Sequence, residues 1–365
     1  MGFKCGIVGL PNVGKSTLFN ALTKTANAQA ANYPFCTIEP NVGDVAVPEP
    51  RLELIAKIGK SAEIIPARMN FVDIAGLVKG ASKGEGMGNQ FLANIRETDA
   101  IIYVLRCFDD DDITHVDGKI DPISDYETIE TELMLADLES LEKRRSGLEK
   151  KIKQNDKNAI QTLHLIETAI SLLEKGQPAR DAVINEADSK AWRMLQLLTS
   201  KPVLFVANVD ESSAENGNRY SEKVISHASE IGAEVVIISA QIESEMSLLD
   251  LDEQKEYLAA IGLEEPGLNR LIQSGYSLLG LQTYFTVGPK EARAWTFHKG
   301  WSAPQCAGVI HGDFEKGFIK AETTAYKDYI DNNGEQGAKE AGKVRQEGKD
   351  YLVRDGDIIL FKFNV

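Results

Sequence analysis

A phosphate-binding pattern stands near the start of the sequence. Gly9-Leu-Pro-Asn-Val-Gly-Lys-Ser16 matches GxxxxGK[ST] at every fixed position. It follows an apolar run over residues 5–9 and precedes a predicted helix over 17–24, which is the strand–loop–helix context that the pattern requires. In such a loop, backbone N–H groups bind phosphate oxygens, the lysine reaches the β- and γ-phosphates, and the serine hydroxyl ligates Mg²⁺. We therefore predict nucleotide contacts from Asn12, Val13, Gly14, Lys15, Ser16 and Thr17, with Lys15 as a catalytic group.

A second segment carries groups that suit a Mg²⁺ site. Asp73-Ile-Ala-Gly76 closes the apolar run over 71–74. A carboxylate at the end of a strand beside the phosphate loop supports the Mg²⁺ shell, and the N–H of Gly76 could contact the γ-phosphate. Thr37, between the two motifs, is a candidate second Mg²⁺ ligand; the alternative is a solvated loop threonine. The predicted metal set is Ser16 and Thr37, with Asp73 in the outer shell.

The segment Asn208-Val-Asp-Glu211 follows the apolar run over 202–207, where related proteins carry the guanine-recognising pattern NKxD. Asparagine is kept, Val209 replaces the lysine, and Glu211 takes the place of the final aspartate. Glutamate is one carbon longer and would meet guanine at the wrong distance, and a missing polar contact can cost several orders of magnitude in discrimination. Loss of guanine recognition does not create adenine recognition, so the residues favour ATP and leave GTP open.

The order of these motifs resembles a known class of proteins. The phosphate loop, Thr37, Asp73-Ile-Ala-Gly76 and the later Ser239-Ala240 follow the order of the translation-factor class of GTPases, and the glycine-rich segment 76–91 resembles the Obg-like superfamily. The helical insertion and the motifs of residues 312–320 and 354–357 resemble the YchF / Obg-like ATPase family, whose C-terminal module is a TGS domain with a β-grasp fold. The resemblance covers essentially the whole chain.

This resemblance implies a cytosolic nucleotide hydrolase that associates with ribosomes and prefers ATP. It places the base near Asn208, Val209, Glu211, Ser239 and Ala240. The small-molecule kinases are a less suitable class, because the insertion and the C-terminal module look like docking surfaces.

Activation of the attacking water is the open question of the sequence. Many relatives place a glutamine directly after DxxG, whereas this chain has Leu77, which cannot form a hydrogen bond. His115 could position the water, or it could be a surface histidine. Asn12 could coordinate a K⁺ ion that activates hydrolysis, or it could be an ordinary turn residue. A bound partner could supply the missing group. A ribosome-binding module in which the nucleotide is structural and turnover negligible stays an alternative.

The arrangement of apolar runs predicts the fold class. Runs at 5–10, 42–47, 70–74, 100–105, 202–207 and 234–239 alternate with helical patterns, which predicts a parallel sheet with helices on both faces. Heptad-like leucine and isoleucine spacing predicts two antiparallel helices with a tip near residue 155. We therefore expect an α/β P-loop NTPase with a Ras-like G domain over 1–127 and 200–277, a coiled-coil insertion over 128–199, and an α+β TGS-like domain over 278–365.

The composition of the chain restricts the expected cellular location and the expected binding partners. The 365 residues carry a net charge of −15 and four cysteines, with no zinc spacing, no secretory signal and no apolar run of membrane-spanning length. The cytoplasm is the expected location, and neither a membrane nor a specific DNA sequence is an expected partner.

A basic cluster lies close to the predicted coiled-coil tip of this acidic protein. Such a cluster suits rRNA phosphates, although a solvated helix face is an equal alternative on the residues alone. Association with ribosomes in the resembled family favours RNA. The cluster consists of Lys143, Arg144, Arg145, Lys150, Lys151, Lys153 and Lys157.

Overall fold

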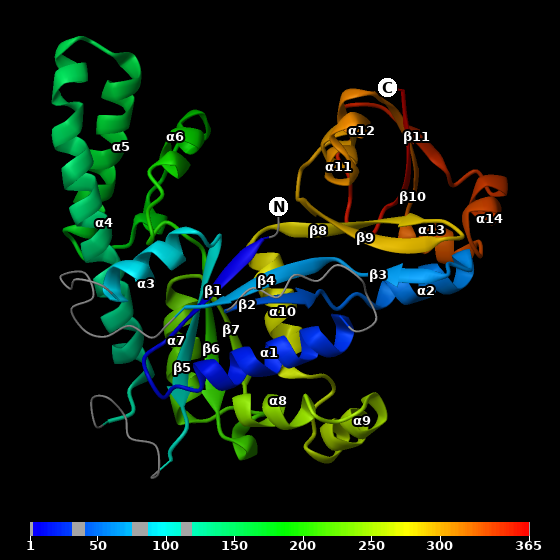
Figure 1. The fold of residues 1–365 in the computed structure, drawn as a ribbon, viewed down its shortest axis with the longest axis horizontal. Coiled ribbons are helices and arrows are strands. Elements are labelled where there is room, and N and C mark those ends of the chain that lie inside the picture. Colours follow the sequence, from blue (N-terminus) through cyan, green and yellow to red (C-terminus); the bar gives the residue numbers. More distant parts are fainter. Residues whose placement is uncertain (1–2, 31–40, 75–86, 111–118, 365) are drawn as a thin grey trace.

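The computed structural model describes residues 3–30, 41–74, 87–110 and 119–364 (Figure 1). Its first sheet has six strands in the order β2-β4-β1-β5-β6-β7. The strands are β1 (Lys4–Val8), β2 (Val42–Ala46), β4 (Arg68–Asp73), β5 (Ala100–Cys107), β6 (Val203–Val209) and β7 (Glu234–Ile238). Neighbours are parallel except at one edge, where β2 runs antiparallel to β4. The prediction of a wholly parallel sheet was therefore wrong for β2, because an apolar run does not encode the direction in which its edge strand pairs.

Helices cover the two faces of this sheet (Figure 1). Every residue of β5 and β6 is buried, as expected for central strands that lie between two helical layers. The helices of this part are α1 (Lys15–Ala30), α3 (Met87–Arg96), α7 (Arg219–Glu230), α8 (Ala240–Met246), α9 (Leu251–Ala260) and α10 (Gly267–Leu278), with a short 3₁₀ turn η3 (Glu211–Ser213) after β6. Because β1, β6 and β7 run parallel, the loops that follow these three strands lie at the same edge of the sheet, the edge formed by the carboxyl ends of the strands.

A pair of long antiparallel helices projects from this domain (Figure 1). α4 (Pro122–Lys153) begins before the predicted boundary at residue 128 and turns at 154–156 into α5 (Lys157–Leu173). The return path contains η1 (Ala179–Asp181), η2 (Glu186–Asp188) and α6 (Ser189–Met194). Leu141, Ile166 and Leu195 belong to a hydrophobic core that joins these elements. In the described part of the chain, no helix has both the length and the apolar character needed to cross a membrane.

The C-terminal module is built on a second six-stranded sheet, in the order β11-β10-β12-β8-β9-β3. Its strands are β3 (Glu63–Ile65), β8 (Leu281–Val287), β9 (Glu291–His298), β10 (Phe318–Thr324), β11 (Arg345–Glu347) and β12 (Ile358–Phe363). Its helices are α11 (Ala303–Ile310), α12 (Gly312–Lys316), α13 (Tyr326–Asp331) and α14 (Glu335–Glu340). β3 comes from the predicted nucleotide domain and pairs in parallel with β9, and α2 (Pro50–Gly59) packs against β9. The boundary at residue 278 thus divides a sheet to which both parts of the chain contribute.

A buried carboxyl joins two helices near the edge of the first sheet. Glu243 on α8 is 2% exposed, and the N–H of Gly267 at the start of α10 donates to its Oε1 at 2.7 Å. Its Oε2 has no hydrogen-bond partner in the structure. Burial raises the pKa of Glu243 to about 7, although N–H groups at the start of α10 and the positive charge of Arg270 oppose this rise.

This raised pKa predicts a pH-dependent stability. The ordinary pKa is 4.5, so the unfolded chain loses this proton first and the native state binds more protons between pH 4.5 and about 7. Stability should therefore fall as the pH rises through this window, by about 3 kcal/mol at most. We expect Glu243→Gln to flatten the change in urea-unfolding midpoint between pH 5 and pH 8. The exposed control Glu256→Gln should keep the wild-type slope, and a Glu243→Gln slope equal to wild type would contradict the assignment.

Candidate functional site

The phosphate loop connects the end of β1 to the start of α1, as its sequence pattern predicts. Asn12 and Gly14 adopt positive φ angles of 64° and 88°, which wrap the backbone around the space in front of α1. A Cβ atom on Gly14 would lie 2.2 Å from Nδ2 of Asn208, so the loop also needs glycine there for steric reasons. The first turn of α1 presents Lys15, Ser16 and Thr17 to the same space.

Lys15 and Asp73 lie in direct contact. Asp73 is the last residue of β4, which pairs with β1, and the register places Asp73 opposite Ile7. The Lys15 ammonium donates to the Asp73 carboxylate, and both side chains are largely shielded from solvent. The predicted phosphate-binding cation and the predicted outer-shell carboxylate of the Mg²⁺ site therefore form one ion pair at the mouth of the phosphate loop.

Asn208 holds the two loops of the site together. Its side chain is 4% exposed and lies at the end of β6. Its Nδ2 donates to the carbonyl of Val13 at 2.8 Å, and its Oδ1 accepts from the N–H of Ala240 at 2.9 Å. Ser239 caps α8 through a hydrogen bond from the N–H of Ile242. The side chain of Asn208 is thus a bridge between loops, rather than an amide that points freely at a base.

These loops enclose a cleft of about 890 Å³. Most of the predicted nucleotide contacts in the described part of the chain line it together, namely Asn12, Gly14, Lys15, Ser16, Thr17, Asn208, Val209, Ser239 and Ala240. Val13 is buried beneath the loop, where its carbonyl accepts from Asn208. Size and polar lining suit a ligand with several phosphate oxygens.

Glu211, a predicted base contact, is not among the residues that line the cleft. This residue opens η3 and is exposed, whereas the lining of the cleft at this point comes from Asn208, Val209 and Asp210. Asp210 caps η3 and lines the cleft beside Val209. Asp210 therefore contributes a carboxylate to the lining, as do Asp109, Asp110 and Glu245.

Sequence reasoning missed several residues that line the cleft. Phe108 follows β5 directly, and Gln241, Ser244 and Glu245 lie on α8. Arg106, 1% exposed, lies over the Phe108 ring with its guanidinium 4.7 Å from the centroid and donates to the Phe108 carbonyl at 3.2 Å. Its position in the sequence could have identified Phe108, because it comes directly after a strand whose carboxyl end lies at the edge of the sheet where the nucleotide site is expected.

Four further residues of the prediction lie outside the described residues. They are Thr37, Gly76, Leu77 and His115. Within the described ranges, no group of three or more His, Cys, Asp or Glu side chains could hold a metal ion by itself. The chemistry of Ser16 and Asp73 nevertheless fits Mg²⁺, because a hydroxyl and a carboxylate supply the hard oxygen donors that this ion prefers and bound phosphates complete its shell.

Comparisons with known proteins agree with this geometry. A family model described as "50S ribosome-binding GTPase" matches residues 4–137, and a model for the C-terminal part of YchF GTPases, described as a "Protein of unknown function", matches residues 281–364. The chain is 58% identical to "Ribosome-binding ATPase YchF" of Haemophilus influenzae over 365 residues and 53% identical to that of Bacillus subtilis over 367 residues, covering 100% of each chain. It is also similar to the solved Schizosaccharomyces pombe YchF GTPase, with a TM-score of 0.88 and 38% identity over 99% of this chain and 98% of that one.

Glycine at position 14 should be indispensable for ligand binding. In Gly14→Ala, the new methyl group would collide with the Asn208 amide and the positive φ would add strain of about 1–3 kcal/mol. We expect the affinity for a nucleoside triphosphate with Mg²⁺, measured by isothermal titration calorimetry, to fall at least about tenfold. Gly147→Ala is the control, because a Cβ there meets no atom within 4 Å. Unchanged affinity in Gly14→Ala would contradict the described packing of the loop.

Proposed function

The chain belongs to the YchF family, and on that premise we propose that it is an Mg²⁺-dependent, ATP-hydrolysing switch that binds the ribosome. Its membership confirms the resemblance found in the sequence and the predicted fold class of a P-loop NTPase with a C-terminal YchF module. It is a nucleoside triphosphatase by that relationship. We propose the cytoplasm as its location and the TGS fold for its C-terminal module.

The observation that carries the proposal is the convergence of the phosphate loop, Asp73 and the Asn208 bridge on one cleft. Lys15 is the group that would neutralise the β- and γ-phosphates. Its ammonium now contacts Asp73, so phosphate binding would exchange one anionic partner for another. That exchange would release the Asp73 carboxylate to support the Mg²⁺ shell.

We propose that Ser16 and Thr37 hold Mg²⁺ and that Gly76 contacts the γ-phosphate. When bound, Mg²⁺ supplies positive charge that stabilises the negative charge developing on the phosphate oxygens. Three sources of help for the attacking water stay open: His115, a K⁺ ion at Asn12, or a group from the bound partner. Leu77 in place of glutamine makes slow intrinsic turnover the expectation.

ATP is favoured over GTP at the base end. Val209 lines the cleft where guanine-binding relatives carry lysine, and Glu211 lies outside the lining. The Phe108 ring, held by Arg106, offers an apolar surface on which a base could stack. Neither feature supplies a hydrogen-bond acceptor for the Watson–Crick edge of guanine, and this supports ATP as the preferred nucleotide.

Turnover of ATP and GTP should test this function directly. We expect ATP to be hydrolysed faster than GTP in the presence of Mg²⁺, K⁺ and ribosomes, and Lys15→Ala to lower ATP turnover at least about 100-fold, as loss of a key charge at the reacting phosphates would. Lys24→Ala on the exposed side of α1 is the matched control. Retained turnover in Lys15→Ala would refute the site, faster GTP turnover would indicate a GTPase, and ribosome binding without turnover would indicate a structural nucleotide.

We propose that the basic cluster at the coiled-coil tip binds rRNA. All seven of its side chains are exposed and lie on the last turns of α4 or at the start of α5. Lys143 pairs with Glu139 within α4, and Arg144 donates to the carbonyl of Leu195 at 2.8 Å. The side chains closest to the turn, Lys150, Lys151 and Lys153, are thus the best placed to meet phosphates.

Replacing these three lysines with alanine should weaken ribosome binding in a salt-dependent way. Each lost phosphate contact should reduce the slope of log affinity against log salt by about one. Co-sedimentation with ribosomes over a series of KCl concentrations measures that slope. A control that replaces the exposed Lys223, Lys290 and Lys349 removes the same charge elsewhere. Equal slopes for the tip variant and wild type would show that the tip is a solvated helix face.

A further inference from the structure

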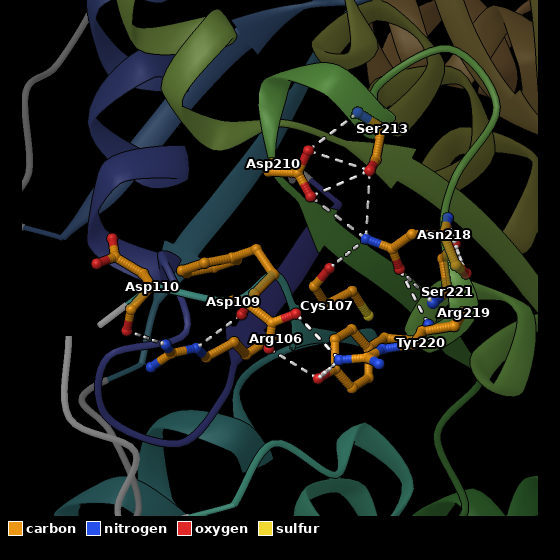
Figure 2. A network of polar contacts seen from close by, with 11 residues as sticks. Arg106, Cys107, Asp109, Asp110, Asp210, Ser213, Asn218, Arg219, Tyr220 and Ser221 are labelled. Atoms are coloured by element: carbon orange, nitrogen blue, oxygen red, sulfur yellow. Dashed lines mark hydrogen bonds and ion pairs between the residues drawn. The ribbon is translucent and has the colours of Figure 1, made fainter. Parts of the chain in front are cut away.

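Asp210 lies at the point where β6 leaves the sheet and enters the base end of the cleft. It lines the cleft, yet its carboxylate is engaged by the turn that follows (Figure 2). Oδ1 accepts from the N–H of Ser213 at 3.1 Å and from the hydroxyl of Ser212. The hydroxyl of Ser213 lies 3.1 Å from Oδ1 and 3.0 Å from Oδ2. We call these two hydroxyl contacts the Ser212–Ser213 clamp.

The clamp is anchored to the neighbouring strand by Asn218. Its Nδ2 donates to the carbonyl of Cys107 at the end of β5, at 2.7 Å, and lies 3.4 Å from the hydroxyl of Ser213 and 3.5 Å from Oδ2 of Asp210. Its Oδ1 accepts from the N–H groups of Tyr220 and Ser221 and so caps α7. Figure 2 shows Asn218 between the β5 end and the Asp210 turn. Three elements therefore fix the direction in which the Asp210 carboxylate points.

The Asp210 carboxyl group is ionised at neutral pH, which suits it to accept several hydrogen bonds. Burial raises its pKa, but the hydrogen bonds from Ser212 and Ser213 outweigh burial and lower the pKa overall. At neutral pH the group is an anion that can only accept hydrogen bonds, and its acceptor sites face Ser212, Ser213 and Asn218.

The two purine bases differ in what they need from such a group. Guanine presents two donors on its Watson–Crick edge, N1–H and the 2-amino group, whereas adenine presents an acceptor at N1 and a donor at its 6-amino group. A carboxylate with free oxygens beside the base would bind guanine's two donors. A carboxylate whose oxygens are already engaged by neighbouring hydroxyl and N–H donors offers these two guanine donors weaker hydrogen bonds, which lowers the gain from binding guanine.

We propose that the Ser212–Ser213 clamp determines base specificity by holding the Asp210 carboxylate away from the base and thereby excluding guanine. This inference rests on the proposed function, because it concerns the nucleotide of that same cleft. It assigns specificity to two serines of the 3₁₀ turn η3 that do not themselves line the cleft.

Calorimetric titration of ATP and GTP, each with Mg²⁺, into four proteins tests the clamp. The proteins are wild type, the double variant Ser212→Ala/Ser213→Ala, the same double variant with Asp210→Asn, and the control Ser226→Ala, which removes an exposed hydroxyl on α7 outside the cleft lining. We expect the double variant to lower the ratio of ATP to GTP affinity at least tenfold through tighter GTP binding. Adding Asp210→Asn should abolish this gain, and Ser226→Ala should keep the wild-type ratio.

The other possible results of these titrations would overturn either the clamp or the proposed function. A wild-type ratio in a double variant whose circular dichroism spectrum matches that of wild type would overturn the clamp, and so would a GTP gain that survives Asp210→Asn. A wild-type preference for GTP would overturn it as well. Wild-type protein that binds neither nucleotide would instead overturn the proposed function. The affinity ratio separates specificity from stability, because a merely loosened turn would weaken both nucleotides together.

Discussion

The side-chain amide of Asn208 is the contact on which the shape of the cleft depends. A buried amide needs partners for both of its ends, and here one end binds the Val13 carbonyl and the other binds the Ala240 N–H. The phosphate loop and the start of α8 are therefore held at a fixed separation by one side chain. Gly14 has to be glycine because that amide occupies the space of its missing Cβ. The phosphate end and the base end of the site are thus set by the same residue.

Short polar contacts connect the projecting parts of the molecule to the nucleotide domain. On α4, Asp137 accepts from the N–H groups of Leu198 and Thr199, both at 2.9 Å, just before β6 begins. β6 then ends at the base side of the cleft. On the other side, Arg51 of α2 pairs with Asp355 of the C-terminal module at 2.7 Å. The coiled-coil helix α4 is thus tied to the segment that leads into β6, and the C-terminal module is tied to α2 of the nucleotide domain.

Composition and spacing predicted the elements whose burial is uniform. The runs that form β5 and β6 are apolar throughout, and the heptad spacing of the α4–α5 pair is a strong periodic signal. Elements that depend on distant partners were not predictable in this way. β3 has only three residues and exists because β9 pairs with it from far along the chain. β11 likewise has three residues and exists because β10 pairs with it, directly after the short helix α14.

The base end shows why a motif can locate a site and still misplace a residue within it. By spacing, Glu211 takes the position of the final aspartate of NKxD, where its longer side chain is predicted to meet guanine at the wrong distance. Serine hydroxyl groups and a backbone N–H two and three residues after Asp210 donate to its carboxylate, so that Asp210 caps the 3₁₀ turn that follows. Glu211 then belongs to the turn and faces solvent. The pattern that matters for this carboxylate therefore includes the donors that follow it, because they decide whether its oxygens face the ligand or the backbone.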